Sequence, residues 1–445
     1  MYFIKQFIIW CFITLCLGCA SEKKNIEIYP DDYHKLVDMV TGIMVHDVYS
    51  PPVASRIYIY PNIASYEVLN QNSETYNSLV GQVNGLATLD VPAVDDDLNL
   101  KLASIIAYID VAKELVFSKD ILVSYRDSLY GNWNTHNSKE FSSAKAYGLN
   151  ISKQILQWME EDNYRETRSM PNFNVYEKDP SRWKPTPPAY MNGIEPHWDK
   201  IRTFVLDSAS QFMPLPPPEF SMKPKTDFHN EVMAVYNVVN EIRALGDTSE
   251  EIEIARFWDC NPFVTVNKGH FMFAEKKITP GAHWMGICQI VSKDSNSDFE
   301  KTVFAYTKTS MGIADAFISC WDEKYRSNLI RPETLINEYI DADWTPLLQT
   351  PPFPEYSSGH SVVSGSAAEV LTAIFGDNIS FDDTTELPYG LPVRAFSSFR
   401  AAAEEAAISR LYGGIHYPSA INEGLSQGVR VGTLVNSEIK FIKNQ

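Results

Sequence analysis

The segment from Ser358 to Gly376 constrains the fold more than any other part of the chain. It opens with Ser358-Gly359-His360, continues as an apolar run rich in alanine and ends at a glycine. A helix that is apolar on all sides has to be buried. We therefore expect a buried helix here. Its first N–H groups would have no partner within the helix, and they would form an anion site at its N-terminus.

Helical periodicity extends over much of the remaining chain. Apolar residues at intervals of three and four predict helices at 98–117, 138–159, 231–245, 251–258, 298–320, 396–412 and 422–439. Proline-rich stretches at 180–188 and 214–224 are predicted to be loops. The expected fold class is all-α, with an N-terminal helical part at 28–230 and a second helical bundle at 231–445.

Charge and composition narrow the class of partner. The chain has 445 residues and a net charge of −18, with ordinary contents of apolar and charged residues. Such a chain can bury a large core, and its negative charge argues against nucleic acid or anionic lipid surfaces as partners. Any positive field for an anionic ligand must therefore be local.

The N-terminus has the features of an export signal. Lys5 is followed by an apolar run at 7–17 and then by Gly18-Cys19. We interpret 1–18 as a signal peptide and 19–27 as a tether, with a lipid on Cys19; plain secretion is the alternative. A transmembrane anchor is less favoured because the run is shorter than about 18 residues. The expected location is the periplasm or the cell surface.

Basic and imidazole side chains in the last third of the chain suit one tetrahedral oxyanion. An oxyanion requires several fixed donors from different directions, and lysine, arginine and backbone N–H groups supply them. Lys324, Arg331 and Arg410 are such donors, and His416 follows a helix broken by Gly413-Gly414. This break is predicted to turn His416 inward.

The spacing of these residues resembles the superfamily of vanadium-dependent haloperoxidases, type-2 phosphatidic acid phosphatases and bacterial acid phosphatases. The three blocks of that pattern occur in order as Lys324 with Arg331-Pro332, Ser358-Gly359-His360, and Arg410 with His416. Between them, Pro351-Pro-Phe-Pro-Glu-Tyr356, Trp321 and the run 407–416 are similar to the haloperoxidase branch. Within that branch, the pattern resembles the iodide- and bromide-oxidising vanadium enzymes of marine bacteria.

This resemblance implies a helical bundle, a vanadate cofactor and a set of roles. His416 would be the protein ligand of vanadium and His360 the proton carrier. The residues around the oxygen atoms of vanadate would be Lys324, Arg331, Ser358, the Gly359 N–H and Arg410. Lys324 would also act in catalysis, and phosphate can occupy the same site. Hydrogen peroxide and a halide are the implied substrates, with small organic acceptors as a further option.

Four other residues are candidates for the substrate pocket. Phe353 would form a wall, with Trp321, Asp322 and Phe263 nearby. Simple packing is the alternative role for the phenylalanines, and a surface charge is the alternative for Asp322. The remaining histidines and cysteines have no familiar ligand spacing, which disfavours an ordinary zinc or iron site.

Two positions depart from the family pattern. Ser357 replaces a proline, and Ala420 replaces the aspartate that commonly follows the last histidine. A carboxylate next to a reactive imidazole holds its tautomer and raises its basicity. Unless Asn422 or Glu423 replaces it, the loss predicts weak phosphatase activity.

Two alternative functions use the same pocket. In a phosphomonoesterase, His416 would form a phosphohistidine and His360 would protonate the leaving alcohol. In a non-catalytic lipoprotein, the basic residues would only bind phosphate or vanadate. The presence of His360 argues against the second alternative, because a pure anion binder needs no acid–base group.

Overall fold

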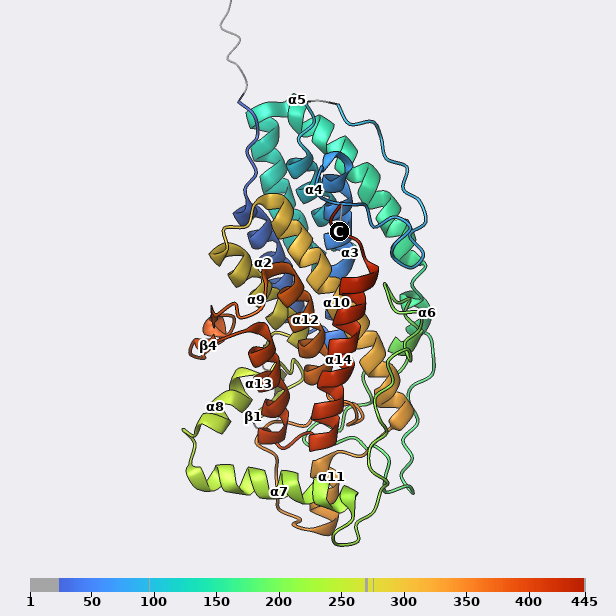
Figure 1. Cartoon of the computed structure of the whole chain (residues 1–445), viewed down its shortest axis with the longest axis vertical. Helices are drawn as coiled ribbons and strands as arrows, with labels where there is room; N and C mark the ends of the chain where they lie inside the picture. Colours follow the sequence, from blue (N-terminus) through green and yellow to red (C-terminus); the bar gives the residue numbers. More distant parts are fainter. Residues whose placement is uncertain (1–23, 96, 269–270, 275, 444–445) are drawn as a thin grey trace, which may run out of the picture.

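The computed structural model describes residues 24–95, 97–268, 271–274 and 276–443. It is mostly helical, as predicted (Figure 1). The longer helices are α2 (Pro30–Asp47), α3 (Pro51–Leu69), α4 (Leu100–Ala112), α5 (Lys119–Glu160), α7 (Asp227–Leu245), α9 (Pro280–Asp294), α10 (Phe299–Ser327), α12 (Gly359–Phe375), α13 (Phe399–Tyr412) and α14 (Pro418–Glu438). The shorter ones are α6 (Tyr164–Thr167), α8 (Glu250–Phe257), α11 (Pro332–Tyr339) and the 3-10 turns η2 (Asn70–Asn72), η3 (Trp198–Lys200) and η4 (Leu387–Tyr389).

Strands are few in the described residues. β1 (Thr265–Lys268) pairs antiparallel with β2 (Phe271–Ala274), and β3 (Phe381–Asp383) pairs antiparallel with β4 (Arg394–Phe396). Residues 180–188 and 214–224 form no regular helix or strand, as their prolines predicted. Among the described helices, none combines the length and the apolar character that a membrane span would need. The predicted signal segment at 1–18 and Cys19 lie outside the described residues.

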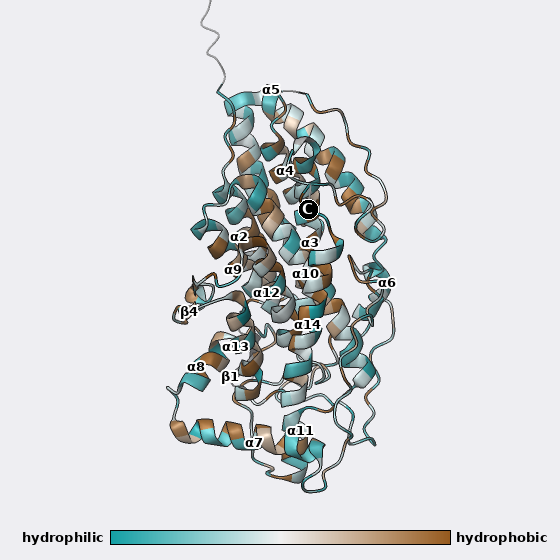
Figure 2. Ribbon diagram, viewed as in Figure 1, coloured by the Kyte–Doolittle hydropathy of each residue, from teal (hydrophilic) through white to brown (hydrophobic). Residues whose placement is uncertain are grey.

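Helix α12 occupies the centre of the C-terminal bundle, where it packs against α14, α13 and α10. A Cβ atom on Gly428 of α14 would lie 2.0 Å from the Val362 carbonyl oxygen, so only glycine permits this close approach. Figure 2 shows that apolar residues concentrate on the inner helices, whereas α5 on the outside carries many polar residues. The prediction that 358–376 forms a buried helix is confirmed.

Four helices were not predicted from the apolar periodicity, and they share one feature. Helices α2, α3, α9 and α11 have proline in their first turn, which looks like a loop signal but is compatible with a helix start. Helix α3 is also buried on every side and has no polar face, so its sequence carries no helical period. It packs against α10, and the main hydrophobic core includes side chains from both parts of the chain.

Candidate active site

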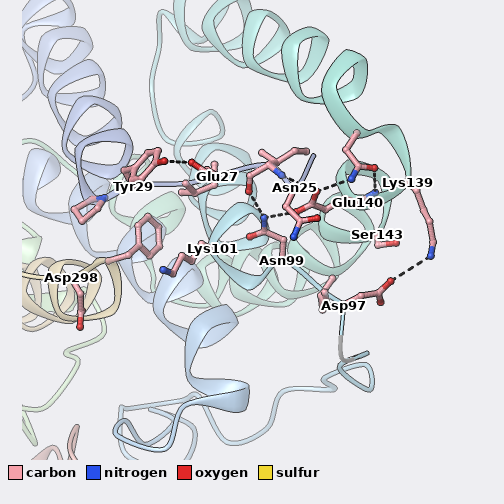
Figure 3. A pocket seen from close by; sticks show the side chains of 16 residues that line it. Asn25, Glu27, Tyr29, Asp97, Asn99, Lys101, Lys139, Glu140, Ser143 and Asp298 are labelled. Carbon is pink, nitrogen blue, oxygen red and sulfur yellow. Dashed lines mark hydrogen bonds and ion pairs between the residues drawn. The ribbon is translucent and has the colours of Figure 1, made fainter. Parts of the chain in front are cut away.

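A small cavity lies where the three sequence blocks meet. Its lining includes Trp321, Phe353, Gly359, His360 and His416, all of which the sequence singled out. A much larger cavity, of about 760 Å³, lies between the start of the described chain and helices α4 and α5 (Figure 3). That cavity contains none of the predicted site residues. The small cavity is therefore the candidate site.

Gly413 and Gly414 direct His416 into this cavity, as predicted. Helix α13 ends at Tyr412, and Gly414 adopts a φ of +76°, a conformation that favours glycine. A Cβ atom on Gly414 would lie 2.8 Å from a methyl carbon of Val239. The chain then turns back, so that His416 is only 2% exposed.

Lys324 lies on α10 with its ammonium group held by the main chain. Its Nζ donates to the carbonyl oxygens of Pro354, Glu355 and Ser357, at 3.1, 3.1 and 2.6 Å. Burial lowers the pKa of Lys324 to about 8. Lys324 thus braces the loop that leads into α12 and brings a positive charge close to the anion site.

The two arginines are fully buried and donate mainly to carbonyl oxygens. Arg331, the residue before α11, donates to the oxygens of Phe353 and Ile415, at 2.9 and 2.8 Å. Its Nη1 also lies 3.2 Å from His416 Nε2, and its buried Nη2 has no protein partner. Arg410 in the last turn of α13 donates from Nη2 to the Ala255 oxygen, at 3.2 Å.

Glu355 supplies the carboxylate that the sequence analysis considered lost at position 420. His416 Nδ1 lies 2.8 Å from Glu355 Oε1, and because this oxygen also accepts from the Tyr417 N–H at 2.9 Å, we assign the imidazole N–H as the donor. Neither substitute takes this place, because Asn422 is exposed on α14 and Glu423 accepts a hydrogen bond from the Leu215 N–H. With Nδ1 protonated, the lone pair of Nε2 remains available for a ligand.

The sequence offered only a faint signal for Glu355. A single glutamate in a loop of prolines and aromatic residues has no fixed spacing from a histidine 61 residues later. Ala420 itself is buried among apolar side chains beside this loop. The prediction of weak phosphatase activity therefore loses the reason given for it.

His360 presents one ring nitrogen to the cavity. Its Nε2 is buried without a protein partner, whereas the main chain of Trp258 hydrogen-bonds to the ring. Burial, followed by the charge of Arg410, lowers the pKa of His360 well below its usual value. Burial and the charge of Arg331 do the same to the pKa of His416. Both imidazoles are thus neutral in this form, and an anion in the cavity would raise both pKa values.

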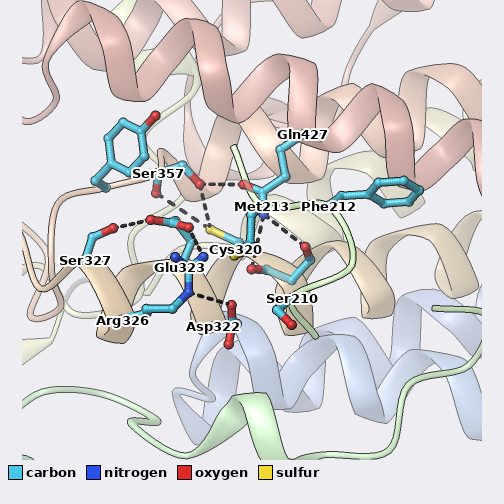
Figure 4. Close-up of polar contacts among 12 residues, drawn as sticks. Ser210, Phe212, Met213, Cys320, Asp322, Glu323, Arg326, Ser327, Ser357 and Gln427 are labelled. Carbon is cyan, nitrogen blue, oxygen red and sulfur yellow. Dashed lines mark hydrogen bonds and ion pairs between the residues drawn. The ribbon is translucent and has the colours of Figure 1, made fainter. Parts of the chain in front are cut away.

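Helix α12 begins at the site. Ser358 is its N-cap, and its Oγ accepts from the Ser361 N–H at 3.3 Å. The preceding residue, Ser357, donates from its hydroxyl to Gln427 Oε1 at 2.7 Å, and Cys320 lies beside it (Figure 4). Serine in place of the family's proline thus ties the entry of α12 to α14 through a side-chain hydrogen bond.

Two of the four predicted pocket residues line the cavity. Trp321 and Phe353 pack with ring centroids 5.1 Å apart, and the Phe353 ring also lies 5.0 Å from Lys324 Nζ. Asp322 does not line it and pairs with Arg326 at 3.2 Å (Figure 4). Phe263 is half-buried in a loop next to the cavity, and its side chain is not part of the lining.

The donors of this site fit a tetrahedral or trigonal-bipyramidal oxyanion such as vanadate. Arg331 Nη2 and His360 Nε2 are buried polar atoms that no protein group satisfies. Both atoms belong to this site, and a bound oxyanion would supply the partners that they lack. His416 Nε2 would be the ligand atom for vanadium, and the N-terminus of α12 adds further donors.

The comparisons with known proteins point to one family. A family model described as "VCPO second helical-bundle domain" matches residues 304–444. Vanadium-dependent bromoperoxidases of Corallina pilulifera and Corallina officinalis are 31% and 30% identical over 107 residues. The match covers 21% of this chain and spans only 18% of the length of those relatives.

Solved structures extend the likeness to the whole chain. A bacterial vanadium-dependent chloroperoxidase has a TM-score of 0.65 at 14% identity, over 88% of this chain and 93% of that one, which shows a shared fold. The structure described as the first bacterial vanadium-dependent iodoperoxidase has a TM-score of 0.92. It is 57% identical, and the match covers 95% of this chain and all of that one. The chain therefore belongs to the vanadium-dependent haloperoxidases.

Proposed function

We propose that this protein uses hydrogen peroxide to oxidise a halide, iodide most readily and bromide less so. One peroxide, one halide and one proton would give one hypohalous acid and one water, with the halide losing two electrons to the peroxide. The observation that carries this proposal is the buried cluster of Lys324, Arg331 and Arg410 around two neutral imidazoles. When bound there, vanadate would supply Lewis-acid activation of peroxide.

The protein residues would divide the remaining work. Arg331 and Arg410 bind and orient the oxyanion, while Glu355 keeps the Nε2 lone pair of His416 directed at it. His360 accepts a proton from the incoming peroxide at its free Nε2 and returns it to the departing oxygen. Trp321 and Phe353 exclude water from one side of the cavity.

Two observations support iodide as the preferred halide. The relative with 57% identity is described as an iodoperoxidase. The cavity wall is aromatic at Trp321 and Phe353, and such a wall suits a large, weakly hydrated halide better than a small, strongly hydrated one. Chloride, whose dehydration requires more free energy, should be the poorest substrate.

Phosphate ester hydrolysis is a second candidate that one contact favours. Because Glu355 holds His416 in one tautomer, the imidazole has the arrangement that a phosphohistidine enzyme needs.

One experiment tests both functions: the purified protein is assayed, with and without added orthovanadate, for iodide, bromide and chloride oxidation and for phosphate ester hydrolysis. We expect vanadate-dependent iodide oxidation and little hydrolysis. Vigorous hydrolysis that vanadate inhibits, without halide oxidation, would reverse the assignment.

We also propose that the protein is exported and carries a lipid on Cys19. The support is the apolar run at 7–17 that ends at Gly18-Cys19. An intact-mass measurement of the mature protein should give a chain that starts at Cys19 with added acyl mass. A chain cleaved elsewhere, without lipid mass, would contradict this proposal.

A further inference from the structure

Three potential metal ligands from distant parts of the sequence meet beside the active-site cavity. They are Cys260 in the loop after α8, His283 on α9 and Glu386 just before η4, and we call them the Cys260 cluster. All three are buried, and their ligand atoms lie within 4.8 Å of one another. Cys260 also contributes to the lining of the cavity that contains His360 and His416.

The spacing within the Cys260 cluster fits a coordinated ion: the two sulfur contacts are within the range of long hydrogen bonds, but the contact between His283 and Glu386 is too long for one. His283 Nδ1 lies 3.4 Å from both Cys260 Sγ and Glu386 Oε1, and the sulfur lies 3.8 Å from that oxygen. A hydrogen bond between imidazole and carboxylate would be about 2.7–3.2 Å. Ligand atoms bound tetrahedrally to zinc at roughly 2.0–2.3 Å lie about 3.3–3.6 Å apart, close to the observed values.

The surroundings of His283 prepare its Nδ1 for a metal. On the other side of the ring, Nε2 lies 2.8 Å from the buried Asp383 carboxylate and 2.8 Å from Thr385 Oγ1. Asp383 is fixed in turn by the N–H and the hydroxyl of Thr385, at 3.0 and 2.7 Å. A carboxylate that accepts one ring N–H fixes the tautomer in which the other nitrogen can bind a metal. Trp258 stacks on the ring, with centroids 4.4 Å apart.

We propose that the Cys260 cluster binds one Zn²⁺ ion, separate from the vanadate site. One thiolate, one imidazole and one carboxylate form a set that zinc accepts, whereas magnesium and calcium require oxygen ligands. The two negative ligands balance the charge of the ion. Three protein ligands leave a fourth position for water.

A metal ion bound here would stabilise the side of the active-site cavity that Cys260 lines. The ion would join the loop after α8 to α9 and to the segment before η4, three segments separated by as many as 126 residues. The same loop contains Trp258, whose main chain hydrogen-bonds to His360. Sequence spacing could not reveal this site, because its ligands come from three separate elements.

The first test is a zinc measurement on the purified full-length protein, prepared without chelators and without vanadate. We expect one zinc ion per chain. Cys260→Ser and Glu386→Gln should each weaken zinc binding by more than about 100-fold, beyond the loss caused by removing an outer partner of a ligand. Cys288→Ser is the matched control. Like Cys260, Cys288 has a buried free thiol, but it lies on α9 outside the cluster. His416→Ala should retain zinc.

A second measurement covers the case in which the Cys260 or Glu386 variants do not fold. Wild-type protein reconstituted with Co²⁺ should show the charge-transfer absorption of a thiolate–cobalt bond, and added Zn²⁺ should raise its melting temperature. The competing possibility is that a proton on His283 Nδ1 takes the place of the ion. Wild-type protein that binds neither ion, or equal zinc in Cys260→Ser and Cys288→Ser, would overturn the proposal.

Discussion

Buried arginines have different partners in two regions of the molecule, around Arg56 in the N-terminal part and around His416 in the C-terminal bundle. In the N-terminal part, Arg56 donates from Nε to Asp162 at 2.6 Å, and Tyr60 donates to the same carboxylate. In the C-terminal bundle, Arg331 and Arg410 are more deeply buried, yet they donate to backbone carbonyl oxygens and, from Arg410, to the Ser409 hydroxyl. Neither arginine forms an ion pair with any carboxylate in the described part of the chain.

This difference separates a structural charge from a functional one. A buried ion pair is neutral as a unit and is complete without a ligand. The cations around His416 retain a net positive charge, and burial lowers the pKa of Arg331 to about 10 and that of Lys324 to about 8. Carbonyl oxygens and Glu355 offset part of their desolvation, and a bound anion would offset more of it. The C-terminal bundle thus contains a region of positive potential, although the net charge of the protein is −18.

The largest effect should come from the two cavity histidines. His416→Ala should abolish vanadate binding, because it removes the ligand atom. His360→Ala should retain vanadate and lose most of its peroxidase turnover, because it removes only the proton carrier. Equilibrium dialysis with vanadate, together with an iodide oxidation assay, measures both quantities. Equal vanadate affinity in wild type and His416→Ala would refute the assignment of the ligand.

The next test applies the same substitution to both halves. Arg56→Met leaves Asp162 buried and unpaired, which should destabilise the protein by about 3–5 kcal/mol. Arg331→Met breaks no direct ion pair, although it removes the donor to the Phe353 and Ile415 carbonyl oxygens, so the anion-free protein should lose less stability than Arg56→Met does while its vanadate affinity falls. Urea unfolding and vanadate dialysis on both variants would measure this. Loss of stability in Arg331→Met as large as in Arg56→Met would remove the distinction between the two halves.

Glu355 lies between these two classes, because it is a carboxylate within the functional cluster. Glu355→Gln should lower vanadate affinity by roughly 10-fold to 100-fold, since the amide no longer fixes His416 in one tautomer. Glu323→Gln on α10 is a matched control, because Glu323 is a buried glutamate that pairs with Arg326 away from the cavity (Figure 4). The control should bind vanadate normally. Equal affinities in the two variants would show that Glu355 is only structural.

The parts of the site that could be predicted are those whose residues lie close together in the sequence. Arg410, Gly414 and His416 lie within seven residues, so a helix end and a glycine turn suffice to place the imidazole. Glu355 and the Cys260 cluster depend on contacts between distant elements, which spacing does not encode. Helix α3 escaped prediction because complete burial removes the polar face that reveals a helical period. The first half of α5, before the kink at Asn137, is missed for the opposite reason: it is largely exposed and has few buried apolar positions to mark a helical period.

The smallest effect concerns a second buried lysine. Burial lowers the pKa of Lys308 to about 8, as for Lys324, but Lys308 lies on α10 beside Phe441, away from the anion cavity. Its charge therefore opposes folding without serving a ligand. Lys308→Met should stabilise the protein at pH 7, by at most about 3 kcal/mol from the size of the pKa shift and nearer about 1 kcal/mol after relaxation around the charge.

The sign of this effect gives its pH dependence. Below pH 8 the lysine is charged in both folded and unfolded states, so the full penalty applies. Between pH 8 and about 10.5 the folded protein loses this proton first, and its stability relative to the variant rises with pH. The advantage of Lys308→Met should therefore be largest at pH 7 and nearly absent at pH 10.5. Urea unfolding of both proteins across this range would measure it, and an advantage that does not change with pH would show that packing, and not charge, separates them.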